Sequence, residues 1–450
     1  MKTKSLLLII AILIIAGILY SIAWPEAPLT VEDTRGYLPV AADLADGQLE
    51  KLHFRTLGYP LILLLTGSTQ APTRALFYLQ LAMYLSAILM LASILHQEIK
   101  HDWVTFLFLI LALLPPAIEY ISIALPEITA LFFITSTVFC FYHSLKRSNI
   151  PWSIGAGLCL VFTAITRPDY QLYSLFLGIF LALFFIILRQ KCVWLRSVLP
   201  FLLVSLIGIG AYVAFNYRTF KFPGIAYYSG ITSTAKTVTM LEEIPDSDAG
   251  IREILIRHRD TNLVEGESHT AVNYIFDALP ELEAYTGLSQ PELSAKLNDL
   301  NLQMILRDPL NYLLSVGKAL SVFLMPSATN QSIFGSQILQ FLWTAIHFAA
   351  LALFLLMLIS LFGVVILAFL LEKCSRTALC RRINSHLILA TILVVCVLTM
   401  VYVTTVSVLL SAGDPRYHVP TAPLALFAIM VFIQFLADLR RKRITLVLKD

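Results

Sequence analysis

Long runs of apolar residues without a charge recur along this chain, and they constrain its fold more than any other feature. Several runs reach eighteen residues or more, which is enough for a helix to cross the ~30 Å hydrocarbon layer of a membrane. Only 14% of the 450 residues are charged and 58% are hydrophobic, whereas about a quarter of a typical soluble domain is charged. The sequence therefore predicts an all-α, polytopic membrane protein and argues against a single water-soluble core.

The apolar runs predict about ten to twelve transmembrane helices. The first run, 5–23, is interpreted as an uncleaved span because it is long and lacks a small-x-small cleavage site. The run 338–370 is too long for one ordinary crossing, so we expect it to tilt or to be followed by an interfacial turn. The short runs 57–66 and 310–326 are expected to be re-entrant or interfacial. The ten predicted spans are 5–23, 74–95, 103–120, 126–143, 151–166, 170–188, 197–215, 338–370, 386–410 and 420–438.

Lysine and arginine in the short loops predict the orientation, because these residues favour the cytoplasmic side. The opposite side is then the outer face of a bacterial inner membrane. A net charge of +3 without a basic patch gives no indication of nucleic-acid binding. The residues that define the predicted cytoplasmic side are Lys2, Lys4, Lys100, Lys146, Arg147, Arg189, Lys191, Arg196, Lys373, Arg376, Arg381, Arg382 and the cluster 440–443.

The polarity of the chain predicts three parts: a transmembrane module over 1–215 with its first outer loop at 24–73, a polar region over 216–330, and C-terminal helices over 331–450. In the polar region, Ser289 and Glu292 form a capping-box pattern, which predicts a helix that runs to Arg307. Asp308 and Pro309 then predict the start of another helix. We therefore expect a small helical cap rather than a separate enzyme domain.

Two acidic positions on the predicted outer face are candidates for chemistry. In the first loop, "VEDTRGY" places Asp33 and Tyr37 four residues apart, on one face of a helix, with Glu32 beside them. Such an acid at a helix start can also be a simple cap. Glu127 opens a predicted span, where an unpaired carboxylate is costly. It is either a helix-start acid in the interface or a second site acid.

The same face carries four arginines: Arg55, Arg167, Arg218 and Arg416. The planar guanidinium suits a phosphate through paired hydrogen bonds, although anchoring at the interface is the alternative for each of them. Asp169 can pair with Arg167. Tyr59 and Tyr417 are candidates to donate hydrogen bonds to the same phosphate. His418 is interpreted as structural, with a metal ligand as the alternative.

Five segments in order resemble the GT-C membrane glycosyltransferases, in particular the protein O-mannosyltransferase and aminoarabinose transferase type (glycosyltransferase families 39 and 83). The first loop matches the family in an acid followed four residues later by Tyr (Asp33 and Tyr37), and in the later motif Arg-Thr-x-Gly-Tyr-Pro at 55–60. The later segments are "IALPEITALFFI", "AITRPDYQLY", "FNYRTFKFPG" and "GDPRYHVPTAPL", and the resemblance covers nearly the whole chain. Leu57 stands where the family often has Pro, and Glu32-Asp33 reverses the usual acid order, so the branch and its sugar stay open.

The resemblance implies a GT-C-like fold and transfer of a sugar from a polyprenyl-phosphate donor to an acceptor outside the cytoplasm, by an inverting reaction. It makes Asp33 the candidate general base, a role that supplies ~10²–10⁴-fold in rate, with Glu32 and Glu127 as further acids. A divalent metal held by Glu32 and Glu127 is one option it leaves open. The acceptor is a protein, a lipid or an envelope glycan. The candidates for the donor phosphate are Arg55, Tyr59, Arg167, Arg416 and Tyr417, and the other site candidates are Tyr37, Asp169, Asn216, Arg218 and His418.

Two alternatives belong to other classes. Transporters also place acids and arginines within the membrane, although mid-span and often in repeated halves. Here the polar motifs lie at span ends on one face, and no repeat is visible. A catalytically silent relative that serves as a partner subunit is the second alternative. Among enzymes, the modest outer region favours transfer of a single sugar from a monophosphate donor over transfer of a whole oligosaccharide.

Overall fold

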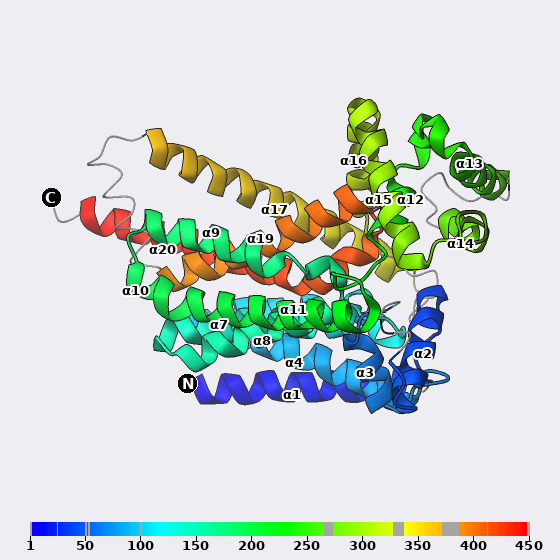
Figure 1. Ribbon diagram of the computed structural model, residues 1–450. Coiled ribbons are helices and arrows are strands. Elements are labelled where there is room, and N and C mark those ends of the chain that lie inside the picture. Colours follow the sequence, from blue (N-terminus) through cyan, green and yellow to red (C-terminus); the bar gives the residue numbers. More distant parts are fainter. Residues whose placement is uncertain are drawn as a thin grey trace.

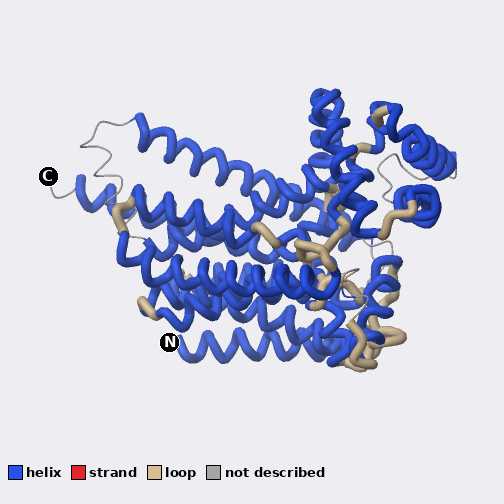
Figure 2. Tube along the Cα trace, in the orientation of Figure 1, coloured by secondary structure: helices blue, strands red, loops and turns tan. Residues whose placement is uncertain are grey.

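The computed structural model describes residues 2–24, 26–49, 52, 55–99, 101–264, 273–326, 337–370, 387–411 and 413–447. Within these ranges the secondary structure is helical apart from one isolated bridge between Leu29 and Ile123. Long helices lie side by side in a bundle, with the start of α1 (Lys2–Ala23) and the end of α20 (Ala422–Val447) at one end and a group of shorter helices at the other (Figure 1). Most of the described loops gather at this second end (Figure 2).

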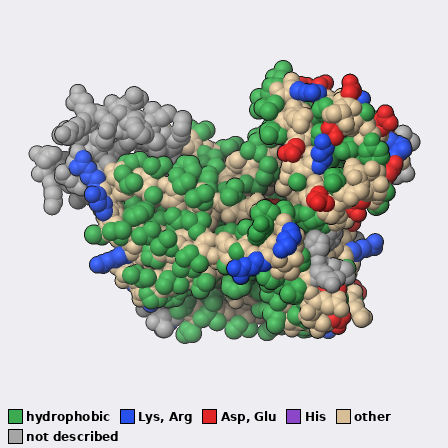
Figure 3. All heavy atoms as spheres, viewed as in Figure 1, with side chains coloured by type: hydrophobic (Ala, Val, Ile, Leu, Met, Phe, Trp, Pro, Cys, Tyr) green, Lys and Arg blue, Asp and Glu red, His purple; other side chains and the backbone are tan. Residues whose placement is uncertain are grey.

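Eight described helical segments are long and apolar enough to cross a membrane, and the chain is therefore a multi-pass membrane protein in its architecture. The side of the bundle seen in Figure 3 is mostly hydrophobic, with a few Lys and Arg side chains, as expected for contact with lipid. The helices on which these segments are built are α1 (Lys2–Ala23), α4 (Arg74–Glu98), α7 (Glu127–Arg147), α9 (Tyr173–Ile187), α11 (Leu199–Phe220), α17 (Gln337–Leu370), α19 (Leu387–Leu410) and α20 (Ala422–Val447).

Two of the ten predicted spans differ from the others in form. The run 103–120 is broken into α5 (Asp102–Ala112) and a segment made of α6 (Pro115–Ile118) and η2 (Glu119–Ser122), with a bend of 69° between them. Two successive prolines at 115–116 explain the break, because proline cannot continue the preceding helix. The run 151–166 forms α8 (Ile150–Thr166), whose 17 residues lie at the short end for a crossing helix. By length and composition the described residues thus contain eight spans, or nine with the bent pair, rather than ten to twelve.

The long run 338–370 forms one continuous helix, α17, of 34 residues. Figure 1 shows this helix inclined to its neighbours, which is one of the two expected ways to accommodate its length. The turn expected after it falls in 371–386, outside the described residues. Five of the predicted cytoplasmic cations also lie outside the described residues: Lys100, Lys373, Arg376, Arg381 and Arg382. The other predicted cytoplasmic cations in short loops lie at helix ends opposite the cap. Which side of the membrane they face remains a prediction.

The first loop is tied to the start of α7. Leu29 pairs with the chain before α7 through hydrogen bonds from its N–H to Ser122 O (2.7 Å) and from Ala124 N–H to Leu29 O (3.0 Å). The Thr34 hydroxyl, in the first turn of α2 (Glu32–Ala45), donates to Ala124 O at 2.8 Å. The short run 57–66 forms α3 (Gly58–Leu65). These contacts place the first turn of α2 next to the start of α7.

The polar region forms a cap of four helices with its own apolar core: α12 (Ser229–Lys236), α13 (Ala249–Val264), α14 (Asn273–Thr286) and α15 (Gln290–Arg307). The predicted start of α15 is confirmed, since the Ser289 N–H donates to Glu292 Oε2 at 2.9 Å. The predicted start of the next helix, α16 (Pro309–Phe323), is confirmed as well, because Asp308 accepts from the Asn311 N–H at 3.0 Å. Charged side chains are concentrated on this cap in Figure 3.

Candidate functional site

Five of the predicted site residues come together at the end of the bundle that carries the cap, which we call the site end. Each lies where a helix begins or has just ended. Asp33 is in the first turn of α2, Arg55 precedes α3, Glu127 begins α7, Arg167 follows α8, and Arg416 lies in the 3₁₀ turn η7 (Pro415–Thr421) before α20. Segments from both halves of the chain therefore build one site.

The first group is an acid between two arginines. Asp33 Oδ1 lies 3.1 Å from Arg55 Nη2, and Asp33 Oδ2 lies 2.5 Å from Arg416 Nη1. The three side chains are 30%, 18% and 25% exposed, respectively. Burial alone would raise the pKa of the Asp33 carboxyl, but the Arg416 and Arg55 guanidinium groups outweigh burial and hold this pKa below its usual value. In this arrangement Asp33 is a well-paired carboxylate and a weak base.

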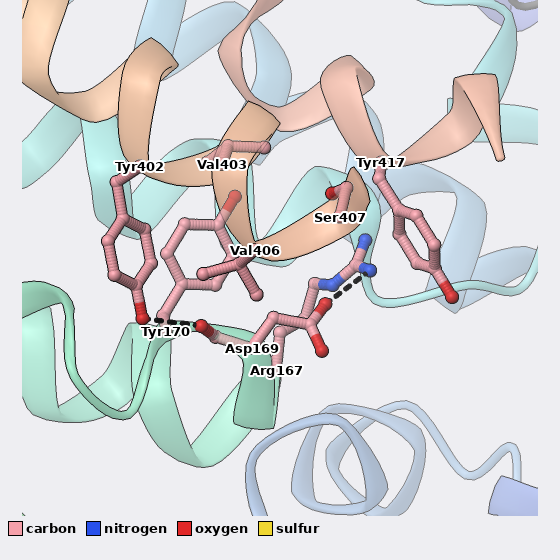
Figure 4. Close-up of a pocket in the computed structure, with 8 residues that line it drawn as sticks. All are labelled: Arg167, Asp169, Tyr170, Tyr402, Val403, Val406, Ser407 and Tyr417. Carbon is pink, nitrogen blue, oxygen red and sulfur yellow. Dashed lines mark hydrogen bonds and ion pairs between the residues drawn. The ribbon is translucent and has the colours of Figure 1, made fainter. Parts of the chain in front are cut away.

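The second group is buried more deeply. Arg167 Nη1 lies 3.1 Å from Glu127 Oε1, and Arg167 Nη2 lies 2.8 Å from Asp169 Oδ2, a contact drawn in Figure 4. The side chains of Glu127 and Arg167 are 2% and 7% exposed. Glu127 Oε2 has no hydrogen-bond partner within the described part of the chain. Because Arg167 precedes Pro168, its backbone is extended, which ends α8 and brings this side chain to Glu127.

Aromatic rings join the two groups and surround their cations. The Tyr417 ring lies 4.8 Å from Arg167 Cζ and 5.4 Å from Arg416 Cζ, so that one ring contacts an arginine of each group. On the other side, Arg55 Cζ lies 4.6 Å from the Tyr37 ring and 5.2 Å from the Tyr228 ring. Tyr228 precedes α12, so the cap contributes directly to the site.

Asp414 holds Arg416 in place. Its Oδ1 accepts the Arg416 backbone N–H at 2.9 Å, and its Oδ2 lies 3.2 Å from Arg416 Nε. Gly413 has a φ of +79°, and a Cβ there would lie 2.1 Å from Ala319 O, so this turn requires glycine. Sequence reasoning missed Asp414, although an acid two residues before a helical N–H is a common cap signal. It also missed Tyr228, for which the sequence contains no signal that we recognise.

Tyr59 and Asn216 have structural contacts in this site region. The Tyr59 hydroxyl donates to Gln80 Oε1 at 3.2 Å, and its ring packs edge-on against Tyr37 at 5.2 Å between centroids. The predicted donation of this hydroxyl to a phosphate would require that hydrogen bond to break. The Asn216 amide donates to Gly224 O at 2.7 Å and Ile225 O at 3.1 Å, which shapes the chain between α11 and the cap.

Three further candidates lie apart from the two groups. Glu32 and Arg218 are exposed, and no ion pair joins either of them to the described residues. His418 Nδ1 lies 3.1 Å from Phe323 O at the end of α16, next to the ring of His347. This contact supports the structural interpretation of His418.

The residues proposed for a metal do not fit a metal site. Glu32 is exposed, whereas Glu127 is buried against Arg167, with Arg416 also close enough to act on it electrostatically. A divalent cation next to Glu127 would meet the repulsion of these arginines. The described residues contain no group of three or more His, Cys, Asp or Glu side chains that could hold a metal ion.

Little space remains around the second group. A pocket of about 10 Å³ lies between Arg167, Asp169, Tyr170, Tyr402 and Tyr417 (Figure 4), close to the lower limit for a single water molecule. The Tyr402 hydroxyl closes one side of it by donating to Asp169 O at 2.7 Å. A sugar or a phosphate would therefore need these side chains to move.

Comparison of the chain with protein-family models, with curated proteins and with solved structures finds no match. The family resemblance therefore stays a prediction.

Proposed function

We propose that this protein is a membrane glycosyltransferase that moves a sugar from a polyprenyl-phosphate donor to an acceptor hydroxyl at the site end of the bundle. The observation that carries the proposal is the Asp33 carboxylate between Arg55 and Arg416. A general base and two phosphate-binding cations are the groups that this reaction needs, and here they are in contact. Their position at helix ends suits a donor whose headgroup stays near water while its isoprenoid tail stays in lipid.

In the proposed mechanism the donor phosphate replaces Asp33 as the partner of the two arginines. The donor phosphate is a diester with one negative charge, and its two non-bridging oxygens can pair with planar guanidinium groups as the Asp33 carboxylate does. When the sugar leaves, the phosphate becomes a monoester and gains negative charge, which strengthens its contacts with the two arginines. Asp33 then loses the cations that hold its pKa down, and burial, which raises the pKa, becomes the dominant effect. Donor binding would thus turn a weak base into a stronger one.

The reaction that follows balances without a further cofactor. Asp33 takes the proton of the acceptor hydroxyl as its oxygen attacks the anomeric carbon of the sugar. The bond from that carbon to the phosphate oxygen breaks, and the electron pair leaves with the phosphate. Arg55 and Arg416 stabilise the negative charge on the leaving phosphate. Attack opposite the leaving group inverts the anomeric centre.

The second group is assigned a positioning role. The Glu127–Arg167 pair connects the start of α7 to the turn after α8, and Tyr417 connects Arg167 to Arg416. Through this ring the orientation of Arg416 depends on a buried and well-packed ion pair.

The first experiment compares envelope glycans and lipids by mass spectrometry in cells with and without the gene, which identifies the sugar and the acceptor.

Asp33→Asn should then reduce transfer at least ~10²-fold, the low end for loss of a general base. Arg55→Ala and Arg416→Ala should each weaken polyprenyl-phosphate binding at least ~30-fold, from a loss of ~2–5 kcal/mol. The matched controls are Asp46→Asn and Arg35→Ala, which change exposed residues of the same loop. Transfer by Asp33→Asn at the wild-type rate would remove Asp33 from its role, and unchanged lipid affinity in both arginine variants would overturn the phosphate site.

A further inference from the structure

An apolar groove with a single cation at one end lies on the lipid-facing side of α1 and α4. Its volume is about 450 Å³, within the usual range of about 300–1,000 Å³ for ligand pockets. Ile14 and Ile18 line it from α1, and Leu81 and Leu85 line it from α4. Gly17 allows close approach of the helices, since a Cβ there would lie 3.1 Å from Leu85 Cδ1.

Among the described residues that line this groove, Arg74 alone is charged, and it lies at the site end, in the first position of α4. Its guanidinium carbon lies 5.3 Å from the ring of Tyr78, one turn further along the helix. No described carboxylate forms an ion pair with Arg74. The groove therefore combines a mostly apolar lining with a positive charge that no described carboxylate pairs with. This combination complements an amphiphile with a negative head.

The length of the groove matches one leaflet. The lining residues of α4 run from Arg74 to Leu85, which is about 16 Å at 1.5 Å per residue. Half of a ~30 Å hydrocarbon layer is ~15 Å. A chain that starts at Arg74 would end near the midplane, as the acyl chain of a leaflet lipid does. An isoprenoid carrier is longer than this groove.

The groove is also separate from the proposed active site. Gln80 on the opposite face of α4 is fully buried and bonds to Tyr59, Ile121 and Ile123. Helix α4 thus stands between the groove and the inner loops, and a lipid in the groove would not be a substrate for the arginines of the site.

We propose that the groove between α1 and α4 binds one anionic phospholipid of the leaflet at the site end, with its headgroup at Arg74 and an acyl chain along Ile18 and Leu85. This site does not depend on the proposed glycosyl transfer. A bound lipid would hold the peripheral helix α1 against α4 next to the point where the first loop begins.

The test is native mass spectrometry of the purified full chain titrated with phosphatidylglycerol and with phosphatidylcholine of the same acyl chains. We expect one phosphatidylglycerol to bind about fivefold more tightly than phosphatidylcholine, which corresponds to ~1 kcal/mol for one basic residue near anionic lipid. Arg74→Gln should remove this preference, and Arg74→Lys should keep most of it. Ala82→Phe, which fills the open side of the groove, should weaken binding of both lipids. Arg35→Gln is the matched control and should behave like the wild type.

Persistence of the preference in Arg74→Gln would overturn the proposal. An equal loss in Arg35→Gln would show a general surface effect instead and would overturn it too. Should Arg74→Gln fail to fold, Ala82→Phe decides alone: wild-type affinity for both lipids in that variant would exclude the groove.

Discussion

Asp33→Asn should tighten the binding of polyprenyl phosphate while it reduces transfer at least ~10²-fold. In the free protein the Asp33 carboxylate occupies both arginines, at 3.1 Å from Arg55 and 2.5 Å from Arg416. Asparagine keeps the size of the side chain but removes the negative charge that a phosphate must displace. Arg55 and Arg416 would then be available to the donor without competition from Asp33.

The size of the effect follows from the strength of the competing contacts. A hydrogen bond to a charged group contributes ~1.5–3 kcal/mol when well buried, whereas exposed ion pairs contribute ~0–1 kcal/mol. These side chains are 18% to 30% exposed, so we take ~1–2 kcal/mol for the competition by Asp33. At 1.4 kcal/mol per decade this predicts about 5- to 30-fold tighter binding.

The measurement is the dissociation constant of polyprenyl phosphate for purified, folded protein at pH 7 and fixed salt, with Asp46→Asn as the control for the loss of one negative charge in the same loop. Equal or weaker binding by Asp33→Asn would refute exchange of Asp33 for the phosphate. Equal tightening in Asp46→Asn would refute it as well, because a long-range charge effect would then be sufficient.

Three further predictions concern stability. Arg167→Met should lower the free energy of unfolding by ~3–5 kcal/mol, because Glu127 stays buried without the cation that it pairs with. The double variant with Glu127→Gln should recover part of this loss, measured as a higher melting temperature than that of Arg167→Met. Gly413→Ala should lower the free energy of unfolding by at least ~1–2 kcal/mol, because residue 413 has a positive φ. The clash of the new Cβ with Ala319 O should lower it further, and the measurement is again the melting temperature. Burial lowers the pKa of Lys236 to about 8, whereas an unfolded lysine titrates near 10.4, so the unfolded chain binds more protons between these values. Stability should therefore rise with pH from about 8 to 10.4, and Lys236→Met should remove this rise.

The positions of the long helices were predictable because a membrane helix requires a long uncharged run, and such runs are visible without tertiary information. The break within 103–120 was missed because a hydropathy window still scores a run that contains Pro115 and Pro116 as a membrane span. These prolines nevertheless interrupt the backbone hydrogen bonds of the helix. The caps at Ser289 and Asp308 were predictable since they depend only on neighbouring residues.

The residues of the site were partly predictable, and of their ion pairs the sequence indicated only Asp169 with Arg167, two residues apart, which is confirmed. Asp33, Glu127, Arg167 and Arg416 were predicted as site residues because each lies in a polar motif near the end of a predicted span. The predicted orientation of the spans places all of these motifs on the same face of the membrane. The sequence could not show that Arg416 reaches Asp33, since this contact depends on how the last turn packs against the first loop. Tyr228 enters the site only because the cap folds back over Arg55, and a contact of this kind leaves no local pattern.

The contacts that would bind a phosphate also hold together segments from both halves of the chain. Asp33 links α2 to η7 through Arg416 and to the start of α3 through Arg55. An alanine variant of either arginine therefore removes a binding group and a structural link at once, and low activity alone would not separate the two effects. Asp33→Asn separates them: loss of a structural link predicts weaker binding and lower stability, whereas loss of a competitor predicts tighter binding. The sign of the change in lipid affinity thus decides whether the donor phosphate replaces Asp33 at the two arginines or whether these ion pairs only stabilise the loops at the site end.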